Sequence, residues 1–194
     1  MVPLRILLAG LLLSVSAAGA NAATYYANNI IEVKAGTCSA SATLCGANDR
    51  QNVNNAVDED EATFYSLGFG GEITLGFALP LITGGQSLSA FEITFDRGRR
   101  HDEAAEVYSV LSGVETLLGT ITNAVGQQTI LTSSTFEYIK LRDVTKALFP
   151  DTTSYDGFDV SVIKISAVPL PAAGTMLLAG LGGLAALRRL KKLV

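Results

Sequence analysis

Four consecutive acidic residues, Asp58 to Glu61, form the most distinctive candidate for chemistry in this sequence. Like charges in one turn repel each other unless a cation offsets them, and Ca²⁺ accepts roughly six to eight oxygen ligands in flexible geometry. Asp58 and Asp60 can aim carboxylates to one side, while the Thr63 hydroxyl and the Asn55 carbonyl can supply further oxygens. The spacing leaves two interpretations open: a calcium site, or a solvated acidic loop.

A second polar stretch, residues 96–103, lies between two segments that read as strands. Arg99, Arg100 and His101 can donate hydrogen bonds to sugar hydroxyls or to the carboxylates of an acidic polysaccharide. Sugar sites commonly add an aromatic face, for which Tyr65 is the candidate. The alternatives are a solvated loop and, for Tyr65, a place in the core.

Residues for catalysis are scarce. His101 is the only histidine, and the sequence contains no zinc-protease helix motif, no nucleophile elbow and no phosphate-binding glycine loop. Two carboxylates could hydrolyse a glycosidic bond, but none of the 18 acidic residues stands out as such a pair. We therefore predict a protein that is not an enzyme and keep a glycan hydrolase as the less favoured alternative.

The N-terminus has the features of an export signal. Arg5 precedes an apolar run, residues 6–13, and the small residues around Ala22 and Ala23 provide a cleavage site between them. Residues 1–22 are therefore a predicted signal peptide. Export leads to an oxidising compartment, where the only two cysteines, Cys38 and Cys45, are expected to form a disulfide. Two unpaired thiols are the alternative.

The C-terminus reads as a membrane segment. Residues 172–187 are apolar and glycine-containing, and as a helix they would reach about 24 Å, against a hydrocarbon core of about 30 Å. The basic residues of the tail, 188–194, would remain on the cytoplasmic side. This pattern predicts a transmembrane helix, and an amphipathic or core helix at the end of the domain is the alternative.

The body between these ends, residues 23–167, is long enough for one domain. It holds all 18 acidic residues but 9 of the 14 Lys and Arg residues, so its net charge is near −9. That charge argues against nucleic acid as a partner. Short alternating runs from Ile73 onward, including a hairpin around Ser112 and Gly113, predict an all-β antiparallel sandwich or barrel. In the run 89–96, Phe91, Ile93 and Phe95 are expected on one face, and Glu92 and Thr94 on the other.

Two stretches carry a resemblance to a known fold. "NNAVDEDEATFYS" (residues 54–66) and "DGFDVSVIKI" (residues 156–165) resemble the discoidin-like, galactose-binding-domain-like jelly roll. In that family a structural calcium lies under such a loop. The resemblance implies as ligands Asn55, Asp58, Asp60, Thr63, the Phe158 carbonyl and Asp159. The family often has tryptophan where this chain has Tyr65, and this chain contains no tryptophan.

The C-terminal residues carry a second resemblance. The order of a proline-containing motif, an apolar glycine-rich segment and a basic end is similar to the VPLPA variant of PEP-CTERM sorting tails; the motif residues are Val168, Pro169, Leu170, Pro171 and Ala172. The resemblance implies an exosortase-type processing enzyme as partner, the inner membrane of a Gram-negative bacterium in transit, and a role in exopolysaccharide or biofilm matrix. A permanent single-pass anchor is the alternative.

These observations predict a signal peptide (1–22), a discoidin-like jelly-roll domain (23–167) and a VPLPA-CTERM sorting signal (168–194). The expected function is a non-catalytic carbohydrate-binding module at the cell surface or in the extracellular matrix, with polysaccharide as its partner and a structural calcium. The main alternative is a structural matrix protein that binds other proteins and no sugar.

Overall fold

The computed structural model of the chain describes residues 23–39, 51–94 and 100–167, together with Gly182. The body Ala23–Val168 forms a compact unit of its own. Its elements, in chain order, are β1 (Thr24–Lys34), η3 (Val53–Ala56), β2 (Tyr65–Ser66), β3 (Glu72–Phe77), β4 (Gln86–Glu92), β5 (Ala104–Leu111), β6 (Val114–Thr122), β7 (Gln127–Leu131), β8 (Tyr138–Asp143), α2 (Thr145–Leu148) and β9 (Asp159–Ala167).

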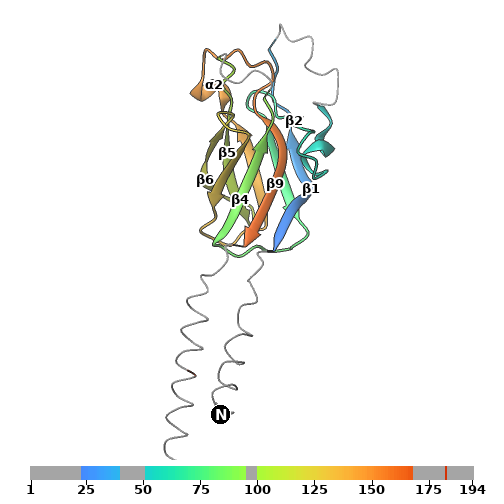
Figure 1. Cartoon of the computed structure of the whole chain (residues 1–194). Coiled ribbons are helices and arrows are strands. Elements are labelled where there is room, and N and C mark those ends of the chain that lie inside the picture. Colours follow the sequence, from blue (N-terminus) through green and yellow to red (C-terminus); the bar gives the residue numbers. More distant parts are fainter. Residues whose placement is uncertain (1–22, 40–50, 95–99, 168–181, 183–194) are drawn as a thin grey trace, which may run out of the picture. The chain divides into compact units, whose positions relative to one another are not determined.

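The strands form an antiparallel sandwich in which β1 belongs to both sheets (Figure 1). The start of β1 pairs with β9 in a sheet of order β1-β9-β4-β7, to which β2 adds beside β9. The rest of β1 pairs with β3 in a five-stranded sheet of order β1-β3-β8-β5-β6. The predicted all-β antiparallel sandwich is confirmed.

The predicted hairpin is also confirmed. β5 pairs with β6 from Ala104↔Thr122 to Leu111↔Val114, so Ser112 and Gly113 are the two turn residues. Both have positive φ, 49° and 79°, which is the backbone that a tight hairpin turn requires at its two central positions. Glycine adopts this conformation without steric cost, and this explains why the Ser-Gly step marked the turn in the sequence.

β8 shows how strand alternation builds the core. Ile139 and Leu141 are fully buried between the sheets, whereas Lys140 and Arg142 point to the outer face of the five-stranded sheet. β9 contributes Ile163 and Ile165 to the same core from the opposite sheet, and Leu88 joins them from β4. Burial of such side chains from both sheets is the main stabilising contribution in a sandwich.

The predicted faces of the run 89–96 were wrong. The strand begins earlier, at Gln86, and its buried residues are Leu88, Ser89, Ala90 and Glu92, whereas Phe91 lies half-buried on the outer face. There the Lys164 ammonium lies 4.3 Å from the centroid of the Phe91 ring. A register irregularity between Ala90 and Glu92 interrupts regular pairing with β9, and Glu92 is buried next to the hydroxyl of Thr94. Phe95 lies outside the described residues.

The two ends of the domain lie together. Thr24, at the start of β1, pairs with Ser166, near the end of β9, and their hydroxyls are 2.9 Å apart. The connections β2–β3, β4–β5, β6–β7 and β8–β9 all lie at the opposite end of the sandwich, where α2 is also found (Figure 1). We call this the loop end. The chain therefore enters and leaves the domain at one end and presents its longest loops at the other.

Candidate functional site

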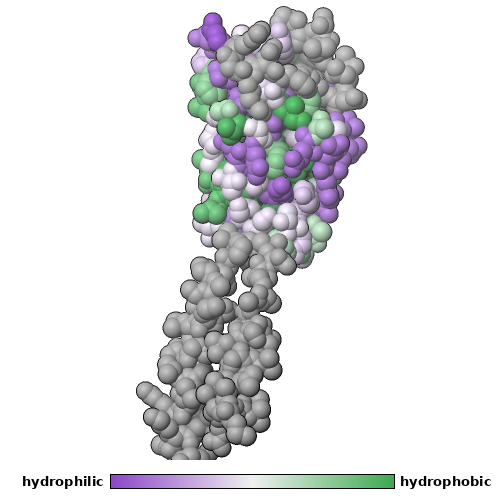
Figure 2. Space-filling model, in the orientation of Figure 1, coloured by the Kyte–Doolittle hydropathy of each residue, from purple (hydrophilic) through white to green (hydrophobic). Residues whose placement is uncertain are grey.

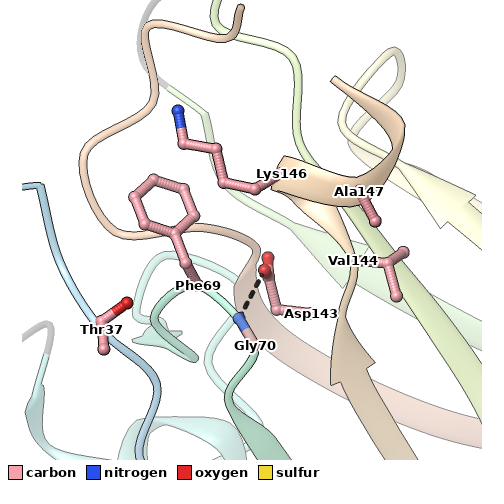
Figure 3. Close-up of a pocket in the computed structure, with 7 residues that line it drawn as sticks. All are labelled: Thr37, Phe69, Gly70, Asp143, Val144, Lys146 and Ala147. Carbon is pink, nitrogen blue, oxygen red and sulfur yellow. Dashed lines mark hydrogen bonds between the residues drawn. The ribbon is translucent and has the colours of Figure 1, made fainter. Parts of the chain in front are cut away.

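A pocket of about 420 Å³ opens at the loop end (Figure 3). Three segments build it: the stretch after β1, which supplies Thr37; the β2–β3 connection, which supplies Phe69 and Gly70; and the start of α2 with the residues before it. From this last segment come Asp143, Val144, Lys146 and Ala147. The volume falls within the range of pockets that hold small ligands.

The side chains of the pocket combine an aromatic ring with polar groups. The Lys146 ammonium lies 4.8 Å from the centroid of the Phe69 ring and also donates a hydrogen bond to the Thr152 carbonyl at 3.3 Å. Figure 3 shows the ring beside the lysine chain, with Thr37 on the other side of the ring. Backbone hydrogen bonds between Thr37 and Phe69, at 2.7 and 3.1 Å, fix the ring's position.

The Asp143 carboxylate holds together the segments that build the pocket. It is 3% exposed, and its carboxylate accepts hydrogen bonds from the Gly70 amide at 3.0 Å, the Thr145 hydroxyl at 2.6 Å and the Phe158 amide at 2.8 Å. Burial raises the pKa of Asp143, although these hydrogen bonds lower it in part. Because its oxygens face inward, Asp143 joins the β2–β3 connection, α2 and the start of β9.

Close backbone contact also fixes the segment after β1 against the β2–β3 connection, next to the pocket. A Cβ atom on Gly71 would lie 1.9 Å from the Leu67 carbonyl oxygen, and one on Gly36 would lie 2.4 Å from the Gly68 backbone. Gly68 itself has φ of 75°. Only glycine meets both conditions, so these residues let the segment after β1 pack directly on the β2–β3 connection.

The acidic loop folds around its own side chains. Asp58 accepts hydrogen bonds from the Asp60 amide at 3.0 Å and from the Thr63 hydroxyl at 2.7 Å, and Asp60 accepts one from the Ala62 amide at 2.9 Å. Glu59, between the two aspartates, has φ of 64°. Three predicted calcium ligands, Asp58, Asp60 and Thr63, therefore lie in direct contact, and all of them present oxygen, the donor that calcium prefers.

The other three predicted ligands have separate partners. The Asn55 side chain donates to the Phe64 carbonyl at 3.0 Å, and the Phe158 carbonyl accepts from the Leu67 amide at 3.1 Å. Asp159 is buried and accepts a hydrogen bond from the Ser66 hydroxyl. β9 also contacts the acidic loop, because the Ser161 hydroxyl, two residues after Asp159, donates to the Asp60 carbonyl at 3.4 Å. Among the described residues, no three His, Cys, Asp or Glu side chains converge as a metal-binding set.

The predicted sugar loop is placed in part. Arg99 lies outside the described residues, and Arg100 is exposed and donates to the Asp151 carbonyl at 3.4 Å. Thr152 contacts both this loop and the pocket, because its hydroxyl donates to the Arg100 carbonyl and its own carbonyl accepts from Lys146. Arg100 is therefore next to the segment that borders the pocket.

His101 faces inward rather than into solvent. Its Nε2 atom lies 3.0 Å from the carboxylate of Glu103, which is 1% exposed, and its ring meets that of Tyr155 edge-on at 6.1 Å. The structure also corrects the prediction for Tyr65. Its ring is 4% exposed and belongs to the hydrophobic core, so it cannot stack on a ligand at the surface.

Sequence reasoning missed the residues that form the pocket and its support. Phe69 and Lys146 are ordinary members of their segments, and the partner of Gly70, Asp143, is 73 positions away. Among the described residues, five acidic side chains at the loop end are buried, and of these only Asp159 was predicted as a site residue; they are Glu92, Glu103, Asp143, Asp156 and Asp159. No local pattern distinguishes a buried acid from a solvated one.

Other predictions lie outside the described residues. These are the signal peptide with its cleavage site at Ala22, the sorting motif 168–172 and the apolar segment 172–187. Cys38 is described and Cys45 is not, so the disulfide stays a prediction. In the described part of the chain, no helix is long and apolar enough to cross a membrane.

Comparison with known proteins gave matches to solved structures alone: no known protein family and no curated protein matched the chain. An F5/8 type C domain of a Bacteroides fragilis protein is similar at 11% identity and a TM-score of 0.46, covering 75% of this chain and 98% of that one. The family 32 carbohydrate-binding module of NanJ from C. perfringens, in complex with galactose, is similar at 13% identity and a TM-score of 0.46, covering 74% and 99%.

A Ruminococcus gnavus GH29 fucosidase in complex with fucose is similar at 16% identity and a TM-score of 0.47. The match covers 80% of this chain and 27% of the fucosidase, so this chain spans about a quarter of that enzyme. These similarities concern the arrangement of the strands. They assign no role to any residue of this chain.

Proposed function

We propose that the domain is a non-catalytic carbohydrate-binding module whose ligand site is the pocket beside Phe69 and Lys146. The observation that carries this proposal is the grouping of an aromatic ring, an ammonium group and a hydroxyl around a hollow of about 420 Å³. The apolar face of a sugar ring packs on an aromatic side chain, and its hydroxyls pair with nearby donors and acceptors. Phe69 would supply the packing surface, with Lys146 and Thr37 as the hydrogen-bonding groups.

The carboxyl groups that line the pocket also favour a binding site over a hydrolytic one. Glycoside hydrolysis uses two carboxyl groups beside the scissile bond. Among the residues that line this pocket the one carboxylate belongs to Asp143, which is buried and bonded to the Gly70, Thr145 and Phe158 groups. These lining residues therefore provide no acid and base pair facing a ligand.

Binding of glycans by matched variants tests the proposal. On an array of neutral and acidic glycans, Phe69→Ala and Lys146→Ala should each weaken saturable binding by roughly tenfold or more, equivalent to about 1.4 kcal/mol. Lys164→Ala is the matched control, because the Lys164 ammonium also lies beside an aromatic ring, 4.3 Å from the Phe91 centroid, and Lys164 does not line the pocket. Equal affinities for all three variants would exclude this pocket as the sugar site.

We further propose that the acidic loop binds a structural calcium ion through Asp58, Asp60 and Thr63, with oxygens of Asn55, Phe158 and Asp159 as further ligands. The ion would offset the clustered negative charge of the loop. The double variant Asp58→Ala, Asp60→Ala should lower the melting temperature in calcium and abolish its response to chelator. Glu61→Ala, which removes a charge from the same loop, should keep that response. A wild-type melting curve that is the same in calcium and in chelator would contradict the site.

The route to the cell surface is proposed from the sequence. The signal peptide would be removed after Ala22, the Cys38–Cys45 disulfide would form after export, and an exosortase-type enzyme would process the tail near residues 168–172. The mature domain would then bind exopolysaccharide in the matrix of a Gram-negative bacterium. Intact mass of the protein recovered from cells and medium tests this route, because retention of Leu193 and Val194 would show a permanent anchor.

A further inference from the structure

The end of the sandwich opposite the pocket exposes large apolar side chains. They are Tyr25, Leu81, Leu111, Val114 and Leu131, with exposed fractions from 37% to 69%. Leu111 and Val114 flank the β5–β6 turn, Leu81 lies in the β3–β4 connection, Leu131 ends β7 and Tyr25 lies at the start of β1. We call these five residues the apolar end. Exposed apolar residues grouped in this way mark an interaction surface.

Hydrogen bonds and strand pairs join the turns of the apolar end. Gln86 pairs with Ala167, the last residue of β9, and its amide bonds to Thr132, the residue after Leu131. On the other sheet, the Ser112 amide of the β5–β6 turn donates to Glu137 at 3.1 Å. The turns are thus held in place at the end of the domain where β9 finishes (Figure 1).

The apolar end differs in charge from the rest of the domain. The turns that form it, residues 79–86, 111–114 and 131–137, contain one charged residue, Glu137, which is the half-buried acceptor of the Ser112 amide. The body as a whole has a net charge near −9. Figure 2 shows hydrophilic residues gathered on the side of β1 and β2, and apolar ones along the side of β6. The turns of the apolar end therefore have few charged groups that would favour contact with water over contact with an apolar partner.

The position where β9 ends points to what covers this surface. Four residues, 168–171, lie between Ala167 and Ala172, the first residue of the apolar segment 172–187. Even fully extended, the five steps from residue 167 to residue 172 reach at most about 18 Å. If the apolar segment enters a bilayer, the end of β9 must stay within that distance of it. The apolar end is then the part of the domain nearest to the lipid.

We propose that the apolar end rests in the interfacial layer of the membrane while the tail is intact, with Val114 and Leu131 among the lipid headgroups and upper acyl chains. The proposal rests on the proposed route to the cell surface, in which the predicted segment 172–187 spans the membrane before the tail is processed. Tyrosine is suited to this layer because it has an apolar ring and a polar hydroxyl, so Tyr25 fits the same contact. The turns contain no lysine or arginine, so neutral lipid suffices and the contact does not weaken at high salt.

Single tryptophans test the contact directly, because the chain contains none. The variants Val114→Trp and Leu131→Trp place a probe at the apolar end, and Val125→Trp is the matched control. Val125 is an equally apolar residue, 52% exposed, in the β6–β7 connection at the loop end. Each full-length variant is reconstituted into phosphatidylcholine vesicles with and without brominated acyl chains. We expect brominated lipid to quench most of the emission at 114 and 131 and to leave 125 unchanged, at low and high salt alike.

Each other outcome overturns the proposal in a distinguishable way. Flotation with the vesicles without quenching at 114 and 131 would show that the domain stands away from the lipid, although the membrane segment is correct. Protection of those probes from an aqueous quencher, without quenching by lipid, would indicate a second copy of the chain on this surface. Failure to float would remove both this contact and the membrane segment, whereas glycan binding at the pocket would be unaffected. Two probe positions guard against a variant that does not fold.

Discussion

The outer face of the five-stranded sheet and the loop end of the sandwich both hold acidic side chains, but with different partners. On the outer face, Glu72 lies 2.7 Å from the Lys140 ammonium and 2.8 Å from the Arg142 guanidinium; Glu72 and Arg142 are partly exposed, and Lys140 is buried beneath them. At the loop end, Glu103 and Asp143 are almost fully buried. Glu103 contacts the hydroxyls of Thr94 and Ser154 and the imidazole of His101, and the Asp143 carboxylate contacts the Thr145 hydroxyl.

The pKa values of these acids shift in opposite directions. Burial alone would raise the pKa of Glu72, but hydrogen bonds and charges from Lys140 and Arg142 lower it below its usual value. Burial raises the pKa of Glu103 and of Asp143 by more than their hydrogen bonds lower it. The loop end therefore holds its acids at a cost in stability, which the outer face avoids through opposite charges. One of the two acids that carry this cost, Asp143, lines the pocket.

Removal of the Asp143 carboxylate should have the largest effect on this comparison. We expect Asp143→Ala to lower the free energy of unfolding by about 3 kcal/mol, because buried donors from Gly70, Thr145 and Phe158 lose their acceptor. Urea unfolding followed by circular dichroism measures this loss. Glu115→Ala, which removes a partly exposed acid from the outer face, is the control and should cost less than about 1 kcal/mol. Equal losses for the two variants would break the comparison.

The pH dependence of stability should separate the two regions. A raised pKa means that the folded state binds more protons than the unfolded state above about pH 4, so Glu103 and Asp143 contribute stability that is lost as pH rises through their folded pKa values. Glu72, whose pKa is lowered, contributes stability that is present above about pH 4 and is lost as pH falls through its folded value.

Urea midpoints measured across this pH range check the signs. Glu103→Gln should flatten the decline on the high-pH side, and Glu72→Gln should flatten the decline on the acidic side. A steeper high-pH decline in Glu103→Gln would reverse the sign assigned to the loop end.

The smallest expected effect is the coupling between Glu72 and Lys140. A double-mutant cycle with Glu72→Gln and Lys140→Met should give a coupling energy of about 0.5 to 1 kcal/mol, reduced by added salt, because Glu72 is partly exposed and the Lys140 ammonium also contacts Glu115 at 2.8 Å. A coupling energy that does not change with salt would mean that the outer face behaves like a buried network.

Local sequence signals predicted much of the fold. The Ser112-Gly113 turn and the alternating runs that became β8 and β9 were found because strand period and turn chemistry act between neighbouring residues. Such local signals gave the wrong faces for β4, because they do not include pairing between strands. Its face is decided by pairing with β9 and by the irregularity at Glu92, which are properties of the sheet rather than of the segment.

The candidate site was harder to predict. Tyr65 stands where the discoidin-like family often has tryptophan and so suggested a surface ring, yet strand pairing with Val160 of β9 places it in the core. Phe69 and Lys146 gain their significance only from each other, across 77 positions of the sequence. A site assembled from loops of different strands leaves no spacing pattern that a single segment could reveal.

The pairing of Thr24 with Ser166 also makes the domain suitable for protein engineering. Since entry and exit are neighbours, the domain could be inserted into a surface hairpin of an unrelated host protein, with short linkers replacing two adjacent turn residues. The inserted domain would present its pocket away from the host. The same neighbouring ends could be joined by a short linker and new termini opened elsewhere, giving a circular permutant with the same strand pairs.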